Sequence, residues 1–225
     1  MHRLGHIDTW IFDLDNTLYP ARSNLFAQID VKMGRYISDL LGVDAEAARV
    51  VQKNYFHSHG MTLKGLMDEH AVDPHHFLDF VHDIDVSVVE HDAQLVEAIA
   101  ALPGRKLVFT NADIPYAARV LDRLGLAHAF EVIHDIHATG YLPKPDPRAY
   151  AGLCDAYGID PARALFAEDM ARNLPPAHAI GMTTVWINNG SEQGPGADLA
   201  QYIDFEISDL SDWLHAVVAT LETNA

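Results

Sequence analysis

Short β-rich runs alternate with amphipathic helical patterns along the chain, and this alternation constrains the fold more than any other feature of the sequence. The predicted strands are residues 9–12, 106–109, 130–133, 164–166, 183–187 and 204–207. Helical patterns fit between the later strands, which is typical of βαβ units. The sequence therefore predicts an α/β fold with a Rossmann-like parallel sheet. Residues 188–198 are predicted to form a loop.

The connection between the first two predicted strands is far longer than the others. A βαβ crossover needs only about a dozen residues, whereas this interval holds several helical patterns. Apolar residues at helical spacing run along 24–41, and Asp44 and Asp73 are placed to cap two further helices. We therefore expect residues 21–90 to form a helical insert directly after the first strand.

Polar side chains follow four of the predicted strands, at the points where these strands end. The first strand stops within WIFDLDNTLYP, which presents two acids two residues apart. The next three are followed by a Thr–Asn pair, a lysine between two prolines, and a Glu–Asp pair. These residues are Asp13, Asp15, Thr110, Asn111, Lys144, Glu168 and Asp169. The carboxyl ends of parallel strands meet in one crevice of an open sheet, so we expect these side chains to lie together.

The chemistry of this set favours a metal site. Four carboxylates around one ammonium group would repel one another in an empty pocket. A hard divalent cation such as Mg²⁺ takes oxygen ligands and would offset that repulsion. One carboxylate could then attack a phosphate, a second could act as general acid and base, and the lysine and hydroxyl could hold the phosphate. The sequence therefore predicts phosphoryl-transfer chemistry with Mg²⁺ as cofactor.

The order of these motifs resembles that of the haloacid dehalogenase-like superfamily of phosphatases. The resemblance rests on FDLDNT, a strand-terminal threonine, a lone lysine, and an acidic pair with an asparagine four residues on, and it covers nearly the whole chain. It implies Mg²⁺-dependent hydrolysis of small-molecule phosphomonoesters through an aspartyl-phosphate. It also implies a helical cap domain at 21–90 and a Rossmann-like core domain formed by 1–20 and 91–225.

The resemblance assigns a role to each motif residue. Asp13 corresponds to the nucleophile and Asp15 to the general acid and base. The implied metal ligands are the Asp13 carboxylate, the main-chain carbonyl of Asp15, and Asp169, with Glu168 binding directly or through water. The implied phosphate-binding residues are Thr110, Asn111 and Lys144.

Two positions depart from parts of the superfamily. Asn173 stands where many members carry a second aspartate, so we expect it only to support the site, by a hydrogen bond to a metal-bound water or to Lys144. The dehalogenases lack the second acid of the first motif, so Asp15 argues against cleavage of a carbon–halogen bond. A non-catalytic relative with the cap as a binding surface is an alternative of another class, but four acids without a function would cost stability.

Two further stretches resemble the pyrimidine 5′-nucleotidase branch, whose members hydrolyse UMP and CMP. They are NYFHSHGMTLKGL at 54–66 and EDMARNLPPAH at 168–178. The first would place Tyr55, His57 and Lys64 over the substrate. A phosphatase for another small organic phosphate, such as phosphoglycolate, and a phosphosugar mutase are the alternatives.

The formal net charge of −17 argues against binding to nucleic-acid polymers and to anionic membranes, because both require a clustered basic surface. The sequence holds no apolar stretch long enough for a transmembrane helix. Its N-terminal segment lacks the basic-then-apolar layout of a signal peptide. We therefore expect a cytoplasmic protein. The sequence gives no indication of its oligomeric state.

Overall fold

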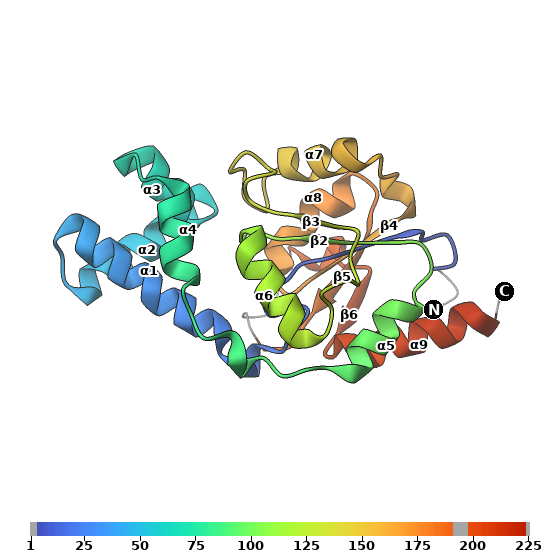
Figure 1. The fold of residues 1–225 in the computed structure, drawn as a ribbon. Coiled ribbons are helices and arrows are strands. Elements are labelled where there is room, and N and C mark those ends of the chain that lie inside the picture. Colours follow the sequence, from blue (N-terminus) through green and yellow to red (C-terminus); the bar gives the residue numbers. More distant parts are fainter. Residues whose placement is uncertain (1–3, 191–197, 224–225) are drawn as a thin grey trace.

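A six-stranded parallel sheet forms the centre of the protein, in the order β3-β2-β1-β4-β5-β6 (Figure 1). The computed structural model describes residues 4–190 and 198–223. The strands are β1 (Thr9–Phe12), β2 (Arg105–Phe109), β3 (Val132–His134), β4 (Ala164–Glu168), β5 (Thr183–Ile187) and β6 (Phe205–Ile207). All pairings are parallel. This confirms the predicted Rossmann-like α/β core, with the strand that precedes Asp13 near the middle of the sheet.

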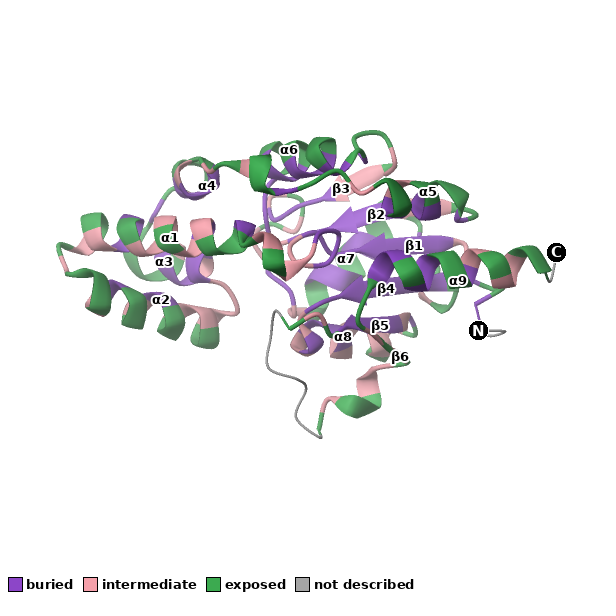
Figure 2. Ribbon diagram, turned by 90° about the horizontal axis from the view of Figure 1, so that it is seen from below, coloured by how far each residue is buried: buried purple, intermediate pink, exposed green. Residues whose placement is uncertain are grey.

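The two faces of the sheet are covered by different helices. In β1, Trp10 and Phe12 face one hydrophobic cluster and Ile11 faces the other, as the alternation of side chains along a strand requires. The first face packs against α5 (Ala93–Ala101), α6 (Ile114–Leu124) and α9 (Leu210–Thr223). The second packs against α7 (Pro147–Tyr157) and α8 (Leu174–Ala179). Burial on both sides explains why the central strands read as continuous apolar runs (Figure 2).

Of the helices between β1 and β2 in the sequence, the first four lie to one side of the sheet in space (Figure 1). They are α1 (Leu25–Leu41), α2 (Ala45–His59), α3 (Thr62–His70) and α4 (Pro74–His82). Asp44 and Asp73 accept hydrogen bonds from the first turns of α2 and α4, as expected of N-caps. The division of the chain into a cap domain at 21–90 and a core domain remains a proposal that fits this arrangement.

Two helices were not predicted from the sequence. The segment of α3 contains Gly65, which disfavours a helix, but a Cβ atom there would clash with the ring of Tyr55 on α2, so the close packing of the two helices requires glycine. The segment of α8 begins LPPAHA, and its prolines occupy the first turn, where their missing amide hydrogens are not needed.

Irregular segments complete the chain. Short 3₁₀ turns lie at Ala21–Ser23, Val86–Val88, Pro161–Arg163, Ala171–Asn173 and Ala200–Tyr202. Strand β3 begins two residues later than predicted, because Phe130 packs edge-on against Phe12 instead of pairing in the sheet. Most of the loop predicted at 188–198 lies outside the described residues.

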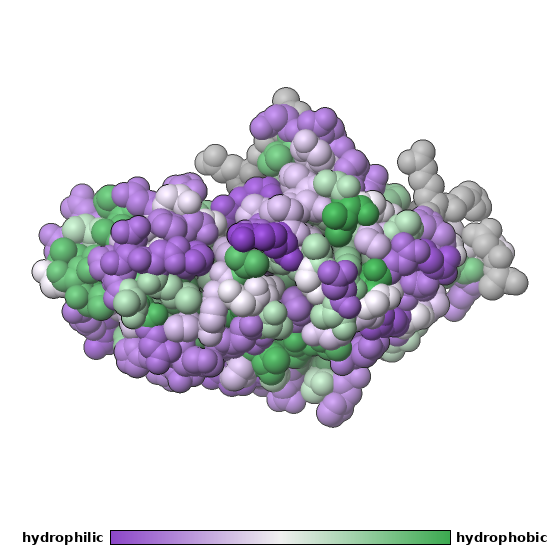
Figure 3. All heavy atoms as spheres, turned by 90° about the horizontal axis from the view of Figure 1, so that it is seen from above, coloured by the Kyte–Doolittle hydropathy of each residue, from purple (hydrophilic) through white to green (hydrophobic). Residues whose placement is uncertain are grey.

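Hydrophilic side chains predominate on the face of the molecule shown in Figure 3, and hydrophobic ones lie in small scattered groups. Among the described residues, the large hydrophobic side chains that are exposed are Phe26, Val31, Leu40, Val50, Val88 and Ile114. Within the described part of the chain, no helix combines the length and the apolar character needed to cross a membrane.

Candidate active site

The residues predicted at the strand ends meet in one cleft of about 720 Å³ between the sheet and helices α1–α4. Asp13 and Asp15 follow β1, Thr110 follows β2, and Glu168 ends β4. The other predicted motif residues that line the cleft are Asn111, Lys144, Asp169 and Asn173. The parallel register of β1 with β2 and β4 brings these strand ends side by side. A backbone hydrogen bond of 2.9 Å from the Asp13 amide to the Ala167 carbonyl fixes the start of the first motif.

Lys144 is the cation at the centre of the site. Its ammonium group is fully buried and donates to Asp13 Oδ1 at 2.5 Å, Glu168 Oε2 at 2.7 Å and the Phe109 carbonyl at 3.0 Å. These three acceptors use all three donors of the ammonium group. Nζ also lies 5.2 Å from the ring centroid of Phe109, within the range of a cation–π contact. Burial of this charge is therefore matched by a complete set of partners.

The electrostatics of the cleft follow from burial and from the crowding of acids. Burial raises the pKa of Asp13 to about 7, and the Glu168 carboxylate adds to the rise while Lys144 opposes it. Burial alone would lower the pKa of Lys144, but the Asp13 and Glu168 carboxylates together raise it above its usual range. Lys144 is therefore always charged, whereas Asp13 takes up a proton near neutral pH when no other cation is present.

Three buried carboxylates form a set that fits a divalent cation. One oxygen each from Asp13, Glu168 and Asp169 lies within 4.8 Å of the others. Asn173 Oδ1 is buried without a hydrogen-bond partner among the described residues, so it could accept from a metal-bound water. All these donors are hard oxygens, the ligand type that Mg²⁺ prefers. The side chain of Asp15 is not in this set, and its predicted contribution through the main-chain carbonyl remains a prediction.

The Asp15 carboxylate is held apart from the metal set by two tyrosines. Its Oδ1 accepts hydrogen bonds from Tyr19 Oη at 2.5 Å and from Tyr116 Oη at 2.6 Å. Burial and the charge of Asp15 raise the pKa of both phenols well above the usual value, so both remain protonated donors. The Tyr116 contact was not predicted, because Tyr116 lies on α6, far in the sequence from the first motif.

Thr110 and Asn111 differ in what they contact. Thr110 Oγ1 is buried and accepts a hydrogen bond of 3.0 Å from the Ala112 amide, so its hydroxyl hydrogen remains to donate to a phosphate. The Asn111 side chain instead accepts from the Lys144 amide at 2.9 Å and donates to the Lys144 carbonyl at 3.4 Å. Asn111 therefore fixes the backbone of the lysine loop, where the Lys144–Pro145 peptide bond is cis.

The family of the chain follows from its match to a protein-family model. The model described as haloacid dehalogenase-like hydrolase matches residues 7–181. The chain belongs to the haloacid dehalogenase-like hydrolases.

Several relatives of this haloacid dehalogenase-like hydrolase are known. The N-acetylmuramic acid 6-phosphate phosphatase of Pseudomonas aeruginosa is 27% identical over 90% of this chain and 93% of its own length. The phosphoglycolate phosphatase of Rhodospirillum rubrum is 27% identical over 91% and 89%, respectively. Phosphate metabolism protein 8 of Saccharomyces cerevisiae is also 27% identical over 77% of this chain, which spans only 59% of the yeast protein.

Solved structures show the same fold. The crystal structure of a HAD phosphatase from Thermococcus onnurineus superposes with a TM-score of 0.63 at 19% identity and covers 96% of this chain and 98% of its own. At this identity the likeness shows the haloacid dehalogenase-like fold alone.

The cap residues expected over the substrate do not line the cleft of this haloacid dehalogenase-like hydrolase. Tyr55 packs against α3, with its hydroxyl 2.8 Å from His70 Nε2, and Lys64 is paired with Asp68 at 2.5 Å. His57 is likewise absent from the lining. The reason is the phase of the helix, because the cleft is lined by Gln52, Lys53 and Phe56 of α2 and by the Gly60 that ends it.

Two residues that line the cleft, Phe56 and Arg172, were not predicted from the sequence. The guanidinium carbon of Arg172, in the loop after β4, lies 3.9 Å from the ring centroid of Phe56, and Arg172 donates to the Gly60 carbonyl at 3.1 Å. Both residues fall inside the stretches that resemble nucleotidases, at 54–66 and 168–178.

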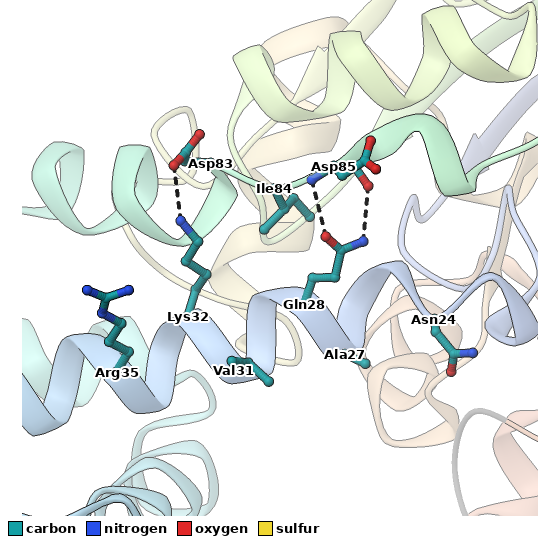
Figure 4. A pocket seen from close by; sticks show the side chains of 9 residues that line it. All are labelled: Asn24, Ala27, Gln28, Val31, Lys32, Arg35, Asp83, Ile84 and Asp85. Atoms are coloured by element: carbon teal, nitrogen blue, oxygen red, sulfur yellow. Dashed lines mark hydrogen bonds and ion pairs between the residues drawn. The ribbon is translucent and has the colours of Figure 1, made fainter.

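A second hollow, of about 730 Å³, lies between α1 and the chain that returns from α4 (Figure 4). Lys32 Nζ contacts Asp83 Oδ2 at 3.0 Å, and the Gln28 side chain makes two hydrogen bonds, of 3.0 and 3.2 Å, with the backbone of Asp85. The hollow contains none of the predicted site residues. Its contacts hold the returning chain of this haloacid dehalogenase-like hydrolase against α1.

Proposed function

We propose that this chain hydrolyses small phosphomonoesters through a covalent aspartyl-phosphate on Asp13. The observation that carries the proposal is the buried carboxylate of Asp13 in the cleft lining, with Lys144 at 2.5 Å and a second carboxyl, Asp15, two residues away. Membership of the hydrolase family and the phosphatase names of two relatives support the same reaction.

The first half of the reaction uses Asp13 as nucleophile and Asp15 as acid. A carboxylate oxygen of Asp13 attacks phosphorus, and the bond between phosphorus and the ester oxygen breaks. Asp15 gives its proton to the departing oxygen, which leaves as an alcohol. The Thr110 hydroxyl would donate to a phosphoryl oxygen, and Lys144, whose three donors contact Asp13, Glu168 and the Phe109 carbonyl, would contribute its positive charge. A divalent ion bound by Asp13, Glu168 and Asp169 would supply charge neutralisation of the phosphoryl group.

The second half returns the enzyme to its starting state. The Asp15 carboxylate takes a proton from a water molecule, and the water oxygen attacks phosphorus of the aspartyl-phosphate. The bond between phosphorus and the Asp13 oxygen breaks, which releases inorganic phosphate and leaves Asp13 ionised. Asp15 has regained the proton that it gave to the leaving group.

Substitution of the two aspartates tests this reaction. Asp13→Asn should keep the fold and lower turnover by about a thousandfold or more, because it removes the attacking oxygen. Asp15→Asn should be nearly as damaging and should let phosphorylated Asp13 accumulate, as detected by mass spectrometry after rapid quenching. Asp155→Asn, at an exposed position of α7, is the matched control. An Asp13→Asn variant that keeps more than about a tenth of wild-type turnover would refute covalent catalysis.

For the substrate we propose a pyrimidine nucleoside 5′-monophosphate such as UMP or CMP. The two stretches that resemble nucleotidases contact each other across the cleft, through Arg172 and Phe56. An aromatic ring and a guanidinium group are the surfaces on which a base can stack. A cleft of about 720 Å³ is also larger than a glycolate leaving group requires.

The runner-up substrate is phosphoglycolate or a sugar phosphate, as the names of the two bacterial relatives suggest. A panel of phosphomonoesters ranked by kcat/KM distinguishes the two proposals. We expect UMP and CMP to exceed AMP, GMP and phosphoglycolate by about tenfold, the effect of one stacking contact. If phosphoglycolate or a hexose phosphate ranks first, the nucleotide proposal fails and the phosphatase proposal stands.

A pair of cap variants locates the binding surface. Phe56→Ala should raise KM for UMP about tenfold through the loss of stacking and change kcat little, because stacking is remote from the reacting bond. Lys64→Ala is the matched variant on the same unit, at a position outside the cleft lining. If Lys64→Ala raises KM for UMP and Phe56→Ala does not, the substrate binds as the sequence alone predicted.

A further inference from the structure

Two buried phenols converge on a single oxygen of the proposed general acid. Tyr19 Oη and Tyr116 Oη lie 2.5 and 2.6 Å from Asp15 Oδ1 and 3.4 Å from each other. Both tyrosines are 1% exposed, whereas Asp15 is half-buried and lines the cleft. No described residue hydrogen-bonds to Asp15 Oδ2. One carboxyl oxygen is thus fixed by the protein and the other is available to the substrate.

We infer that Tyr19 and Tyr116 are positioning residues that fix the orientation of the Asp15 carboxyl, so that Oδ2 meets the leaving oxygen. The inference rests on the proposed function. The terminal torsion of an aspartate is soft, so the side chain alone does not define where its oxygens lie. Two charge-assisted hydrogen bonds to one oxygen remove that freedom. Correct placement matters because a misplacement of about 1 Å can cost about a hundredfold in rate.

The two tyrosines lie near the two ends of the α1–α4 segment, and Tyr116 has further contacts of its own. Tyr19 follows the first motif directly, where the chain leaves the sheet toward α1. The ring of Tyr116 stacks on His82, the last residue of α4, at 4.4 Å between centroids and 15° between planes. Asp113 accepts from the Tyr116 amide at 3.1 Å and contacts His82 Nδ1 at 2.9 Å. Asp15 is thus contacted by a residue of the connection from β1 to α1 and by a residue packed against the end of α4.

The test compares two esters that differ in their need for a proton. p-Nitrophenolate is a weak base and departs without protonation, whereas an alkoxide such as that of β-glycerophosphate needs the proton from Asp15. The ratio kcat/KM reports the steps up to departure of the leaving group. Tyr116→Phe should lower kcat/KM for β-glycerophosphate about tenfold to a hundredfold, the effect of one charge-assisted hydrogen bond. The loss with p-nitrophenyl phosphate should stay below about threefold.

Matched variants separate positioning from general destabilisation. Tyr19→Phe removes the other donor to Oδ1 and provides the same measurement if Tyr116→Phe does not fold. Tyr36→Phe removes the hydroxyl of a buried tyrosine that contacts His76 at 2.9 Å, away from the cleft lining, and should leave kcat/KM for both esters unchanged. Equal losses for both esters, or a selective loss in Tyr36→Phe, would overturn the inference while the phosphatase proposal stands. A wild-type protein inactive on every phosphomonoester tested would overturn both.

Discussion

Replacement of Lys144 by methionine should leave the buried carboxylates of Asp13 and Glu168 without the cation that lies between them. Methionine has a similar length and keeps the contacts with Phe109 and Phe166, but it removes the charge between Asp13 and Glu168. Removal of one partner from a buried ion pair typically costs about 3–5 kcal/mol of unfolding free energy. The repulsion left between the Asp13 and Glu168 carboxylates agrees with that range. Their nearest oxygens lie within 4.8 Å of each other, and two charges at that distance repel by about 3 kcal/mol at an effective dielectric constant of about 20.

The loss should also depend on pH, with a sign that the site geometry fixes. A carboxyl whose pKa is raised by folding binds more protons when folded than when unfolded, so the folded state loses stability as pH rises from the unfolded pKa to the folded pKa. In the wild-type protein this interval for Asp13 runs from 3.8 to about 7. Without Lys144, which lowers the pKa of folded Asp13, the upper end of this pH interval lies higher. The destabilisation should therefore be larger at pH 8 than at pH 6, by about 1–2 kcal/mol.

Urea unfolding of the metal-free proteins, followed by circular dichroism at both pH values, measures these quantities. Lys106→Met is the control, because Lys106 is half-buried on β2 and forms no ion pair with a described residue. We expect the control to lose less than about 1 kcal/mol, as is usual for substitutions away from buried networks. If Lys144→Met lost no more unfolding free energy than the control, at either pH, the buried acids would be stable without the lysine, which would refute the predicted electrostatic role of Lys144.

Three further results are expected at the metal site. Excess chelator should abolish phosphate release, Mg²⁺ should restore it and Ca²⁺ should inhibit, because Ca²⁺ adopts looser geometry with more ligands; full activity in chelator would contradict the metal site. The apparent Mg²⁺ affinity, measured by calorimetry, should fall about tenfold per pH unit below about 7, because Asp13 must lose its proton to bind the ion; an affinity independent of pH would contradict the raised pKa. Asp169→Ala should raise the Mg²⁺ concentration for half-maximal activity far more than Asn173→Ala does, and equal effects would remove Asp169 from the ligand set.

The sequence predicted the helices and strands of the core well because their signals act between residues that are close in the chain. Asp92 and Asp113 each precede an apolar run and accept hydrogen bonds from the first turns of α5 and α6, and such a residue is a local signal of a helix start. The meeting of the motif residues in one cleft could be predicted because a parallel sheet collects its strand ends at one edge. Neither inference required knowledge of contacts distant in the chain.

The features that sequence reasoning missed depend on such distant contacts. The phenol of Tyr116 reaches Asp15 across 101 residues, and an apolar helical stripe gives no reason to separate it from a core tyrosine. Tyr55 and Lys64 were chosen over Phe56, which lines the cleft, because a resemblance identifies a stretch of sequence but not the face that a helix turns toward the cleft. That face is decided by the packing of α2 against α1 and α3, which only the three-dimensional structure supplies.

The tryptophan next to the acidic cluster makes the protein suitable for optical titration without a label. The indole nitrogen of Trp186, buried on β5, donates to the main-chain carbonyl of Asp169 at 2.8 Å. Trp10 donates instead to the Pro103 carbonyl, toward the opposite end of its strand, and Trp213 lies on α9. A cation drawn to Asp169 changes the field around one indole among the three, so its arrival registers as a change in intrinsic fluorescence that Trp186→Phe should abolish.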